Sequence, residues 1–249
     1  MDELIQSECI GKILSITLNR AGKKNALSTA MYEALTRLFV QGDKDDTVAV
    51  IHITGSGDSF CAGNDIGDFL AAARHGALDS PARLFLQQLN RQRKPVVAAV
   101  NGMAVGIGVT MLLHFDFVYA ATDARFRLPF VDLGLVPEGG SSALLPLMLG
   151  HRRASELLMT GSGFDAASAE RLGIVNAVLS AEQLIVRSWA MAELLAGKPP
   201  LALQQTKAMM KLNPGQPLAK VIDSEVDQFM DCLRASEAQR ALRALMGGD

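Results

Sequence analysis

A run of eighteen residues without a charge, residues 96–113, constrains the fold of this chain more than any other segment. The run reads "VVAAVNGMAVGIGVTMLL" and is long enough to cross a bilayer as a helix. Asn101 and Gly102 interrupt it at its centre, however, and Asp116 and Asp123 follow soon after it. We therefore expect a buried strand, a turn and a buried helix, and we expect no membrane association.

The periodicity of the flanking sequence predicts that strands and helices alternate along most of the chain. Alternating or β-branched apolar residues predict strands, and apolar residues at helical spacing predict a helix that opens at Ser28. The predicted strands cover residues 4–10, 13–18, 48–55, 96–100 and 115–121. Up to about residue 180, this alternation predicts an α/β fold with a mostly parallel sheet under helical cover.

Beyond residue 180 the pattern is helical. It predicts helices over residues 180–196, 199–212 and 217–246. Ser180 and Gln183 predict a capping box at the start of the first of these helices. The segment "AGKPPLA" predicts a hinge, so we expect a core domain of residues 1–196 and a helical region of residues 197–249. We expect this helical region to pack on the core or on another subunit.

Composition argues against several classes of function. The net charge of -2 and the scattered basic residues argue against nucleic acid as a partner. The three cysteines and four histidines lack metal-ligand spacing, so we expect no metal site. Gly102, Gly106 and Gly108 do not match the dinucleotide fingerprint. The acidic start "MDELIQSE" lacks the apolar segment of a signal peptide, so the cytoplasm is the expected location.

Two glycine-bearing turns have the composition that backbone chemistry requires. They occur in "FCAGNDIGDF" at residues 60–69 and in "AAVNGMAVGIGVTMLL" at residues 98–113, and each joins a strand to a helix. Glycine permits close backbone approach, and a helix start leaves N–H groups unpaired. Two such turns that face each other can direct two N–H donors at one oxygen, as an oxyanion hole does. Plain turns are the alternative.

A third segment places one carboxylate at a rigid turn. In "LGLVPEGGSSALLP", Glu138 lies between Pro137 and the pair Gly139 and Gly140, which would fix the direction of its side chain. A solvated loop glutamate is the ordinary interpretation. A directed general base is the functional one.

Five segments in order resemble the crotonase family, the enoyl-CoA hydratase/isomerase superfamily, over essentially the whole chain. They are "RAGKKNALS", "FCAGNDIGDF", "KPVVAAVNGMAVGIG", "FDFVYAATDARFRLPFVDLGLVPEGG" and "AERLGIVNAV". The resemblance implies a crotonase-type spiral of repeated β-β-α units with a C-terminal helical trimerisation region. It therefore implies a homotrimer or a hexamer. It also implies an acyl-CoA thioester substrate, with coenzyme A as part of the substrate and no separate cofactor.

Matching the motifs position by position gives the expected site. The backbone N–H groups of Asn64 and Ile107 would form the oxyanion hole, and the Asn64 side chain would be incidental. Cys61 has no adjacent base, which argues against covalent catalysis. For Asp65, helix capping is the alternative to a binding role. The expected acyl-CoA contacts are Asn25, Ala26, Ala62, Gly63, Asn64, Asp65, Ile66, Gly106 and Phe130.

The catalytic acid distinguishes the branches of the family. Family hydratases carry two glutamates, at positions that are Thr110 and Phe130 here, and neither of these residues can activate water. The monofunctional Δ3,Δ2-enoyl-CoA isomerases resemble this chain in an acid directly before two glycines, which is Glu138 here. The resemblance therefore favours an isomerase in which Glu138 shuttles a proton. Phe130, Leu133 and Leu135 are expected to raise the pKa of Glu138 by desolvation. A hydratase, a thioester hydrolase and a non-catalytic acyl-CoA-binding protein are the alternatives.

Overall fold

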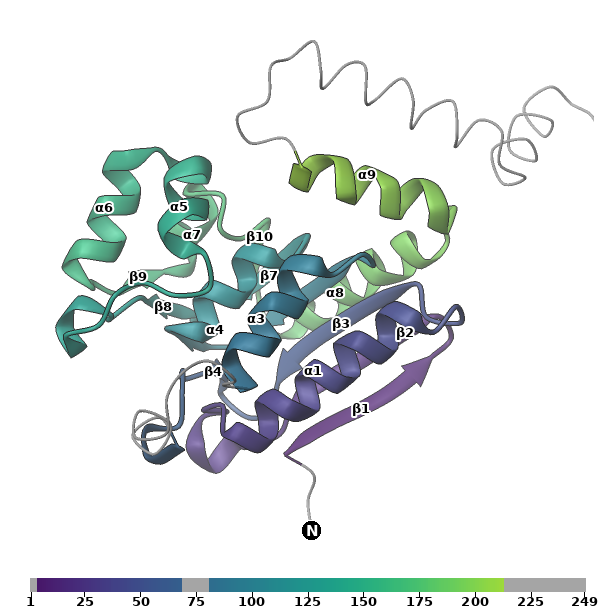
Figure 1. The fold of residues 1–249 in the computed structure, drawn as a ribbon, viewed down its shortest axis with the longest axis horizontal. Coiled ribbons are helices and arrows are strands. Elements are labelled where there is room, and N and C mark those ends of the chain that lie inside the picture. The colour runs from purple at the N-terminus through teal and green to yellow at the C-terminus, as the bar shows by residue number, and fades with distance from the viewer. Residues whose placement is uncertain (1–3, 69–80, 213–249) are drawn as a thin grey trace, which may run out of the picture.

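The computed structural model describes residues 4–68 and 81–212, and within these ranges the strands form two sheets (Figure 1). The larger sheet has six strands in the order β1-β2-β3-β5-β7-β10, with β1 antiparallel to β2 and the remaining pairs parallel. Its strands are β1 (Ile5–Ile10), β2 (Ile13–Leu18), β3 (Val50–Gly55), β5 (Val96–Val100), β7 (Phe117–Ala121) and β10 (Ala177–Leu179). The smaller sheet contains β4 (Ser59–Cys61), β6 (Met103–Val105), β8 (Arg125–Arg127) and β9 (Phe164–Asp165), in that order.

Three consecutive strand pairs repeat one arrangement. In β3–β4, β5–β6 and β7–β8, the first strand belongs to the larger sheet and the second belongs to the smaller one, after a short turn. The predicted crotonase-type α/β architecture is thereby confirmed. Because β4, β6 and β8 run parallel, their carboxyl ends lie at the same edge of the smaller sheet. Ligands of parallel α/β sheets bind at this kind of edge.

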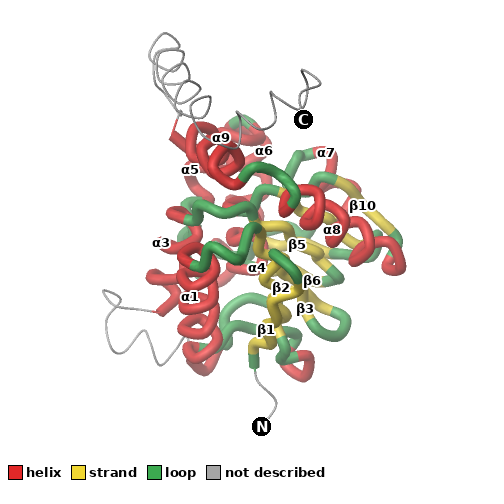
Figure 2. Tube along the Cα trace, turned by 90° about the vertical axis from the view of Figure 1, so that its right-hand side faces the viewer, coloured by secondary structure: helices red, strands yellow, loops and turns green. Residues whose placement is uncertain are grey.

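Helices cover both faces of the larger sheet (Figure 2). On one face, α1 (Thr29–Lys44) and α3 (Pro81–Arg91) pack over a core in which the rings of Phe39 and Phe85 meet edge to face at 5.6 Å. On the other face, α8 (Ala181–Ala196) covers a second apolar cluster that includes Val50, Val97 and Tyr119. Ser28 caps α1 as predicted, because its hydroxyl accepts the Met31 N–H at 3.3 Å.

Shorter helices surround the smaller sheet. They are η1 (Ala21–Lys23), α4 (Ile107–Thr110), η2 (Met111–His114), η3 (Val131–Leu133), α5 (Ser141–Leu149), α6 (His151–Thr160) and α7 (Ala166–Arg171). The uncharged run at residues 96–113 forms β5, β6, α4 and most of η2, so the predicted strand and helix are confirmed, but a second short strand, β6, lies between them where only a turn was expected. In residues 4–68 and 81–212, no helix combines the length and the apolar character needed to span a bilayer.

The predicted capping box at the start of α8 is wrong. Ser180 occupies the N-cap position, but its side chain makes no hydrogen bond to the first turn of the helix. The hydroxyl bonds instead to the Glu182 carboxylate and lowers the pKa of that carboxyl. The Ser180 hydroxyl, which a capping box would use, therefore bonds to Glu182, two residues after the N-cap position.

The predicted hinge corresponds to the break between α8 and α9 (Pro200–Leu212). Helix α9 is tied to the core by Lys207, which is buried and donates to Asp116 Oδ2 at 2.6 Å and to the Lys94 carbonyl at 2.9 Å. The described part of the helical region thus packs on the core. The predicted helix at residues 217–246 lies outside the described residues, and assembly into trimers stays a prediction.

Beneath α8, a buried histidine predicts a pH dependence of stability. Burial lowers the pKa of His52 from 6.5 to about 4, and the His52 side chain bonds to Ser188 Oγ at 2.9 Å. Between pH 6.5 and pH 4, His52 therefore binds a proton in the unfolded chain but not in the folded chain. The unfolding free energy consequently falls as the pH drops from 6.5 toward 4. We expect this group to remove about 3 kcal/mol of the unfolding free energy across that window. Urea unfolding of the wild type and of His52→Leu at pH 6.5 and at pH 4 measures how much unfolding free energy each protein loses. Equal losses in the two proteins would contradict it.

Candidate active site

The two glycine-bearing turns lie side by side at the carboxyl ends of β4 and β6. These strands pair in parallel, with Ser59 opposite Met103 and Cys61 opposite Ala104. The chain leaves β4 through residues 62–64 and leaves β6 through residues 106–107. The turns that the sequence places 43 positions apart, at Asn64 and Ile107, are therefore spatial neighbours.

Glycines permit this close approach of backbone to backbone. A β-carbon built on Gly108 would lie 2.3 Å from the Cys61 carbonyl oxygen, which no side chain tolerates. One built on Gly63 would lie 3.3 Å from the Val105 carbonyl oxygen, and Gly63 also has a φ of +103°. Gly106, at the N-cap of α4, has a φ of 54°. The motif glycines are thus required by contact and by conformation.

The first predicted donor is the backbone N–H of Asn64. Leu27 bridges the two peptides around it, donating to the Gly63 carbonyl at 2.8 Å and accepting from the Asp65 N–H at 2.9 Å. Successive N–H groups of an extended segment point to opposite sides, so the Asn64 N–H points away from Leu27. Within the described part of the chain, no hydrogen bond uses this N–H. It is available to an acceptor from outside.

The second predicted donor is the backbone N–H of Ile107, the first residue of α4. The N–H groups of Val109 and Thr110 both bond to the Gly106 carbonyl, at 2.9 Å each. A first-turn N–H has no intrahelical partner, and among the described residues the Ile107 N–H has no acceptor. Two adjacent loops therefore present one unpaired N–H each, as an oxyanion hole requires.

Glu138 reaches the same helical segment. Thr110 Oγ1 donates to Glu138 Oε1 at 2.5 Å, which places the carboxylate one helical turn from the Ile107 N–H. Gly139 allows this contact, since a β-carbon there would lie 2.9 Å from Thr110 Oγ1. The His114 ring bonds to the Gly139 carbonyl at 2.8 Å. Residues 107–114 thus contain the second N–H donor and also bind the turn that carries Glu138.

The electrostatics of Glu138 suit a base. Burial raises the pKa of Glu138, and the Thr110 hydrogen bond opposes the rise without cancelling it. The direction agrees with the prediction, but the expected apolar wall is only partly correct. Phe130 is buried, whereas Leu133 and Leu135 are 66% and 38% exposed, because the turn at η3 and Gly134 carries them outward.

Cys61 lies beside the first turn as a buried thiol. Burial raises its pKa to about 12, so the thiol stays protonated at neutral pH. A protonated thiol is a poor nucleophile, which agrees with the expectation that Cys61 does not act covalently.

The other expected binding residues are divided between structural and exposed positions. Asn25 is fully buried, and its side chain accepts from the Arg20 N–H and donates to the Ser56 and Ser59 carbonyls. Asp65 pairs with Arg20 at 2.8 Å and accepts the Gly67 and Asp68 N–H groups, so the capping alternative is confirmed. Ile66 is exposed.

Ala26 and Ala62 belong to two segments that run alongside each other. The Ala62 N–H donates to the Lys24 carbonyl at 2.9 Å, and the Ala26 carbonyl accepts from the Arg20 guanidinium at 3.0 Å. Any substrate contact of these residues, as of Asn25, would come from the backbone, and it stays a prediction.

Tyr32 is a residue of this region that the sequence did not indicate. Its hydroxyl donates to Asn64 Oδ1, and its side chain is only 5% exposed. In the sequence it lies between Met31 and Leu35 on the apolar face of a helix, so it is indistinguishable from core. The available signal is that a buried tyrosine hydroxyl usually has a partner.

The Thr110 hydrogen bond predicts a shift in the pH profile. Replacing Thr110 with valine removes a donor that favours the charged carboxylate, so the pKa of Glu138 should rise further. If Glu138 acts as a base, the acid limb of kcat/KM should move to higher pH, while activity at the high-pH plateau changes less. Rates on an enoyl-CoA across the pH range measure this shift. An unmoved limb would show that Glu138 is not the titrating group.

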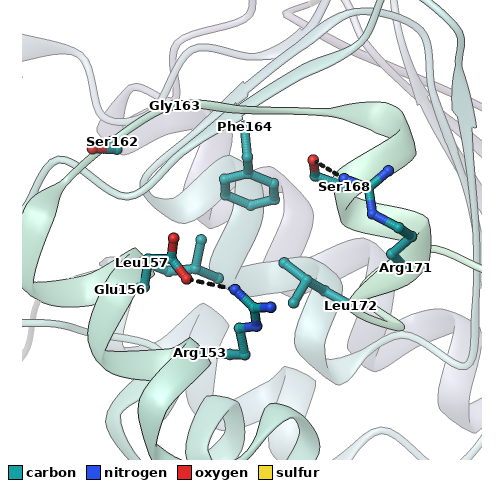
Figure 3. A pocket seen from close by; sticks show the side chains of 9 residues that line it. All are labelled: Arg153, Glu156, Leu157, Ser162, Gly163, Phe164, Ser168, Arg171 and Leu172. Carbon is teal, nitrogen blue, oxygen red and sulfur yellow. Dashed lines mark hydrogen bonds and ion pairs between the residues drawn. The ribbon is translucent and has the colours of Figure 1, made fainter.

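A separate cavity of about 390 Å³ lies between α6, α7 and the segment around Phe164 (Figure 3). Two arginines at its rim already have partners, since Arg153 bonds to Glu156 at 2.9 Å and Arg171 bonds to Ser168 Oγ at 2.8 Å. Asn64, Ile107 and Glu138 are not part of its lining, so it is distinct from the candidate active site.

Comparisons with known proteins identify relatives of this chain. Residues 8–246 match the family described as enoyl-CoA hydratase/isomerase. An enoyl-CoA delta isomerase 2 of Rattus norvegicus is 36% identical over 89% of this chain, which spans only 57% of that protein's length. A mevalonyl-coenzyme A hydratase of Aspergillus fumigatus is 35% identical over 90% of this chain and 84% of its own. A solved structure from Magnetospirillum magneticum AMB-1, described as an enoyl-CoA hydratase/carnithine racemase, has a TM-score of 0.94 and 44% identity, covering 99% and 97% of the two chains.

Proposed function

The chain belongs to the enoyl-CoA hydratase/isomerase family, and from this premise we propose that it is a Δ3,Δ2-enoyl-CoA isomerase in which Glu138 shuttles the proton. Membership of the family supports an enzyme that acts on a coenzyme A thioester. The finer assignment rests on the acid. One carboxylate, Glu138, contacts the helical segment that carries a free N–H, and this is the observation that carries the proposal.

Residues at the two positions of the hydratase glutamates support isomerisation over hydration. Thr110 is buried and gives its hydroxyl hydrogen to Glu138, so it serves the carboxylate and does not act as a second base. Phe130 is buried and has no polar side-chain atom. Neither of these two positions therefore supplies a second carboxylate to hold a water, and Glu138 is left to move the protons.

The proposed reaction needs only one carboxylate and two amides. Glu138 removes a proton from C2 of a 3-enoyl thioester, and the electron pair delocalises into the thioester oxygen as a dienolate. The N–H groups of Asn64 and Ile107 bind this oxyanion. The protonated Glu138 then returns the proton to C4, and the double bond is left between C2 and C3. The raised pKa of Glu138 favours the first transfer, because it makes the carboxylate a stronger base toward the C2 proton.

Every step of this scheme is a proton transfer with no net change in oxidation state. The reaction therefore calls for no redox cofactor, and coenzyme A enters as part of the substrate.

Hydration is a second candidate, because a relative with 35% identity is named as a hydratase. In that case Glu138 would activate a water for addition to C3 of a 2-enoyl thioester. A hydrolase acting on the thioester would use the same acid and oxyanion hole on a different bond.

Product analysis on paired substrate panels distinguishes these reactions. We expect 3-enoyl-CoA thioesters of several chain lengths to become 2-enoyl-CoA of unchanged mass, and 2-enoyl-CoA to remain unhydrated. Chromatography and mass spectrometry read both panels. Accumulation of 3-hydroxyacyl-CoA from the 2-enoyl panel, faster than isomerisation of the 3-enoyl panel, would replace the proposal with a hydratase.

A further inference from the structure

We propose that Tyr32 is a positioning residue for the oxyanion hole, and that it acts through the side chain of Asn64. The inference deepens the proposed function and rests on it, because it assigns a purpose to a contact behind the first N–H donor. The juxtaposition that carries it is a buried hydroxyl on α1 hydrogen-bonded to the side chain of the residue whose backbone faces the site.

The peptide around Asn64 has two independent anchors. Leu27 holds it from the backbone, through the Gly63 carbonyl and the Asp65 N–H. Tyr32 holds it from the side chain, through Asn64 Oδ1. Leu27 and Tyr32 flank the N-terminus of α1, so one segment fixes the donor turn at two points. The backbone bridge alone would still allow some rotation of the Asn64 backbone. The hydrogen bond from Tyr32 to the Asn64 side chain opposes that rotation.

Tyr32 itself is held rigidly. Its ring packs against Phe85 with centroids 5.9 Å apart, and its own carbonyl accepts the Thr36 hydroxyl at 2.8 Å. Burial raises the pKa of Tyr32 well above its usual range, and the nearby Cys61 and Glu138 add to the rise. The phenol therefore stays protonated at neutral pH and remains a hydrogen-bond donor to Asn64.

The expected consequence is selective for the charged state. A neutral thioester oxygen bonds weakly to the Asn64 N–H, whereas an enolate oxygen bonds strongly and depends more on the direction of the donor. Loss of the Tyr32 hydroxyl should therefore lower kcat and weaken binding of an enolate. It should leave KM and the affinity for a saturated acyl-CoA nearly unchanged.

A double-mutant cycle tests the route through Asn64. Tyr32→Phe should reduce kcat by about tenfold, which is less than the effect of deleting a donor outright. Asn64→Ala keeps the backbone N–H but removes the side-chain partner, so it should cost a similar factor. In the Asn64→Ala background, Tyr32→Phe should have no further effect, because the two residues act as one unit. Tyr119→Phe is the matched control, since Tyr119 is equally buried but lies on the opposite face of the larger sheet.

Binding of acetoacetyl-CoA, which can bind as its enolate, provides a readout that does not depend on turnover. We expect Tyr32→Phe to weaken acetoacetyl-CoA at least fivefold relative to butyryl-CoA, and Tyr119→Phe to leave the ratio unchanged. Equal effects of Tyr32→Phe in both backgrounds, or an unchanged ratio with only a lower Tm, would overturn the inference. If the wild type binds the enolate but forms no isomer, the proposed function fails while the Tyr32 result can still be read.

Discussion

Replacing Glu138 with glutamine is expected to reduce isomerase turnover by about 10²–10⁴-fold or more, because a positioned general base commonly supplies that much of the rate. Glutamine keeps the length of the side chain and can still accept the Thr110 hydroxyl through its carbonyl oxygen. Acyl-CoA affinity should therefore change little. Steady-state rates on a 3-enoyl-CoA, together with calorimetric binding of a saturated acyl-CoA, separate the two effects.

Glu156→Gln provides the matched control for this variant. Glu156 is exposed and pairs with Arg153 on α6, so its replacement should leave turnover unchanged. If Glu138→Gln retains near wild-type turnover, the proposed mechanism is wrong. Asp65 and Asp132 would be tested next, although each is already paired with an arginine, Arg20 and Arg127 respectively.

Replacing Gly108 with alanine is expected to reduce turnover by about 10²–10³-fold, the cost of losing one oxyanion-hole donor. The added β-carbon would lie 2.3 Å from the Cys61 carbonyl oxygen, and backbone on both sides would have to separate. That movement displaces α4, which carries the Ile107 N–H and the Thr110 hydroxyl. Rates and thermal unfolding by circular dichroism, measured on the same preparation, show whether activity falls further than stability explains.

Gly197→Ala is the control for the loss of a glycine. Gly197 has a φ of −83°, and a β-carbon there would make ordinary contacts at 3.6 Å. We expect wild-type turnover from this variant. Full activity in Gly108→Ala would mean that the two turns do not need their close approach, and the oxyanion hole would then lie elsewhere.

The strands of the larger sheet could be predicted because their signal is local. Runs such as "VVAAV" are apolar on both faces, as strands buried under helices must be. The predicted ends of the strands are less accurate, because tertiary contacts decide where a strand begins. The predicted strand at residues 115–121 begins at Phe117, because the Asp116 carboxylate accepts the Val96 N–H at 2.8 Å and pairs with Lys207. The sequence around Asp116 contains no sign of either partner.

The candidate site likewise has features that could be predicted from the sequence and features that could not. Glu138 and the two glycine-bearing turns could be predicted because they lie in ordered sequence motifs. Glycine is the residue expected wherever one backbone segment must approach another closely. The supporting contacts could not be found. Thr110 and Glu138 are 28 positions apart, and Tyr32 and Asn64 are 32 apart. Neither pair shares a helix face or a strand, so only the packed fold brings the partners together.

The most direct test of the proposed mechanism is the fate of a 3-enoyl-CoA, and of a 2-enoyl-CoA in parallel, in water enriched in the heavy oxygen isotope. We expect the wild type, but not Glu138→Gln, to convert the 3-enoyl-CoA to a 2-enoyl-CoA of the same mass, with no heavy oxygen in any product. Heavy oxygen in a 3-hydroxyacyl-CoA made from the 2-enoyl-CoA, with the 3-enoyl-CoA left unchanged, would identify a hydratase, and heavy oxygen in a free carboxylic acid would identify a hydrolase. Either result would contradict the proposal that Glu138 moves a proton and does not activate water.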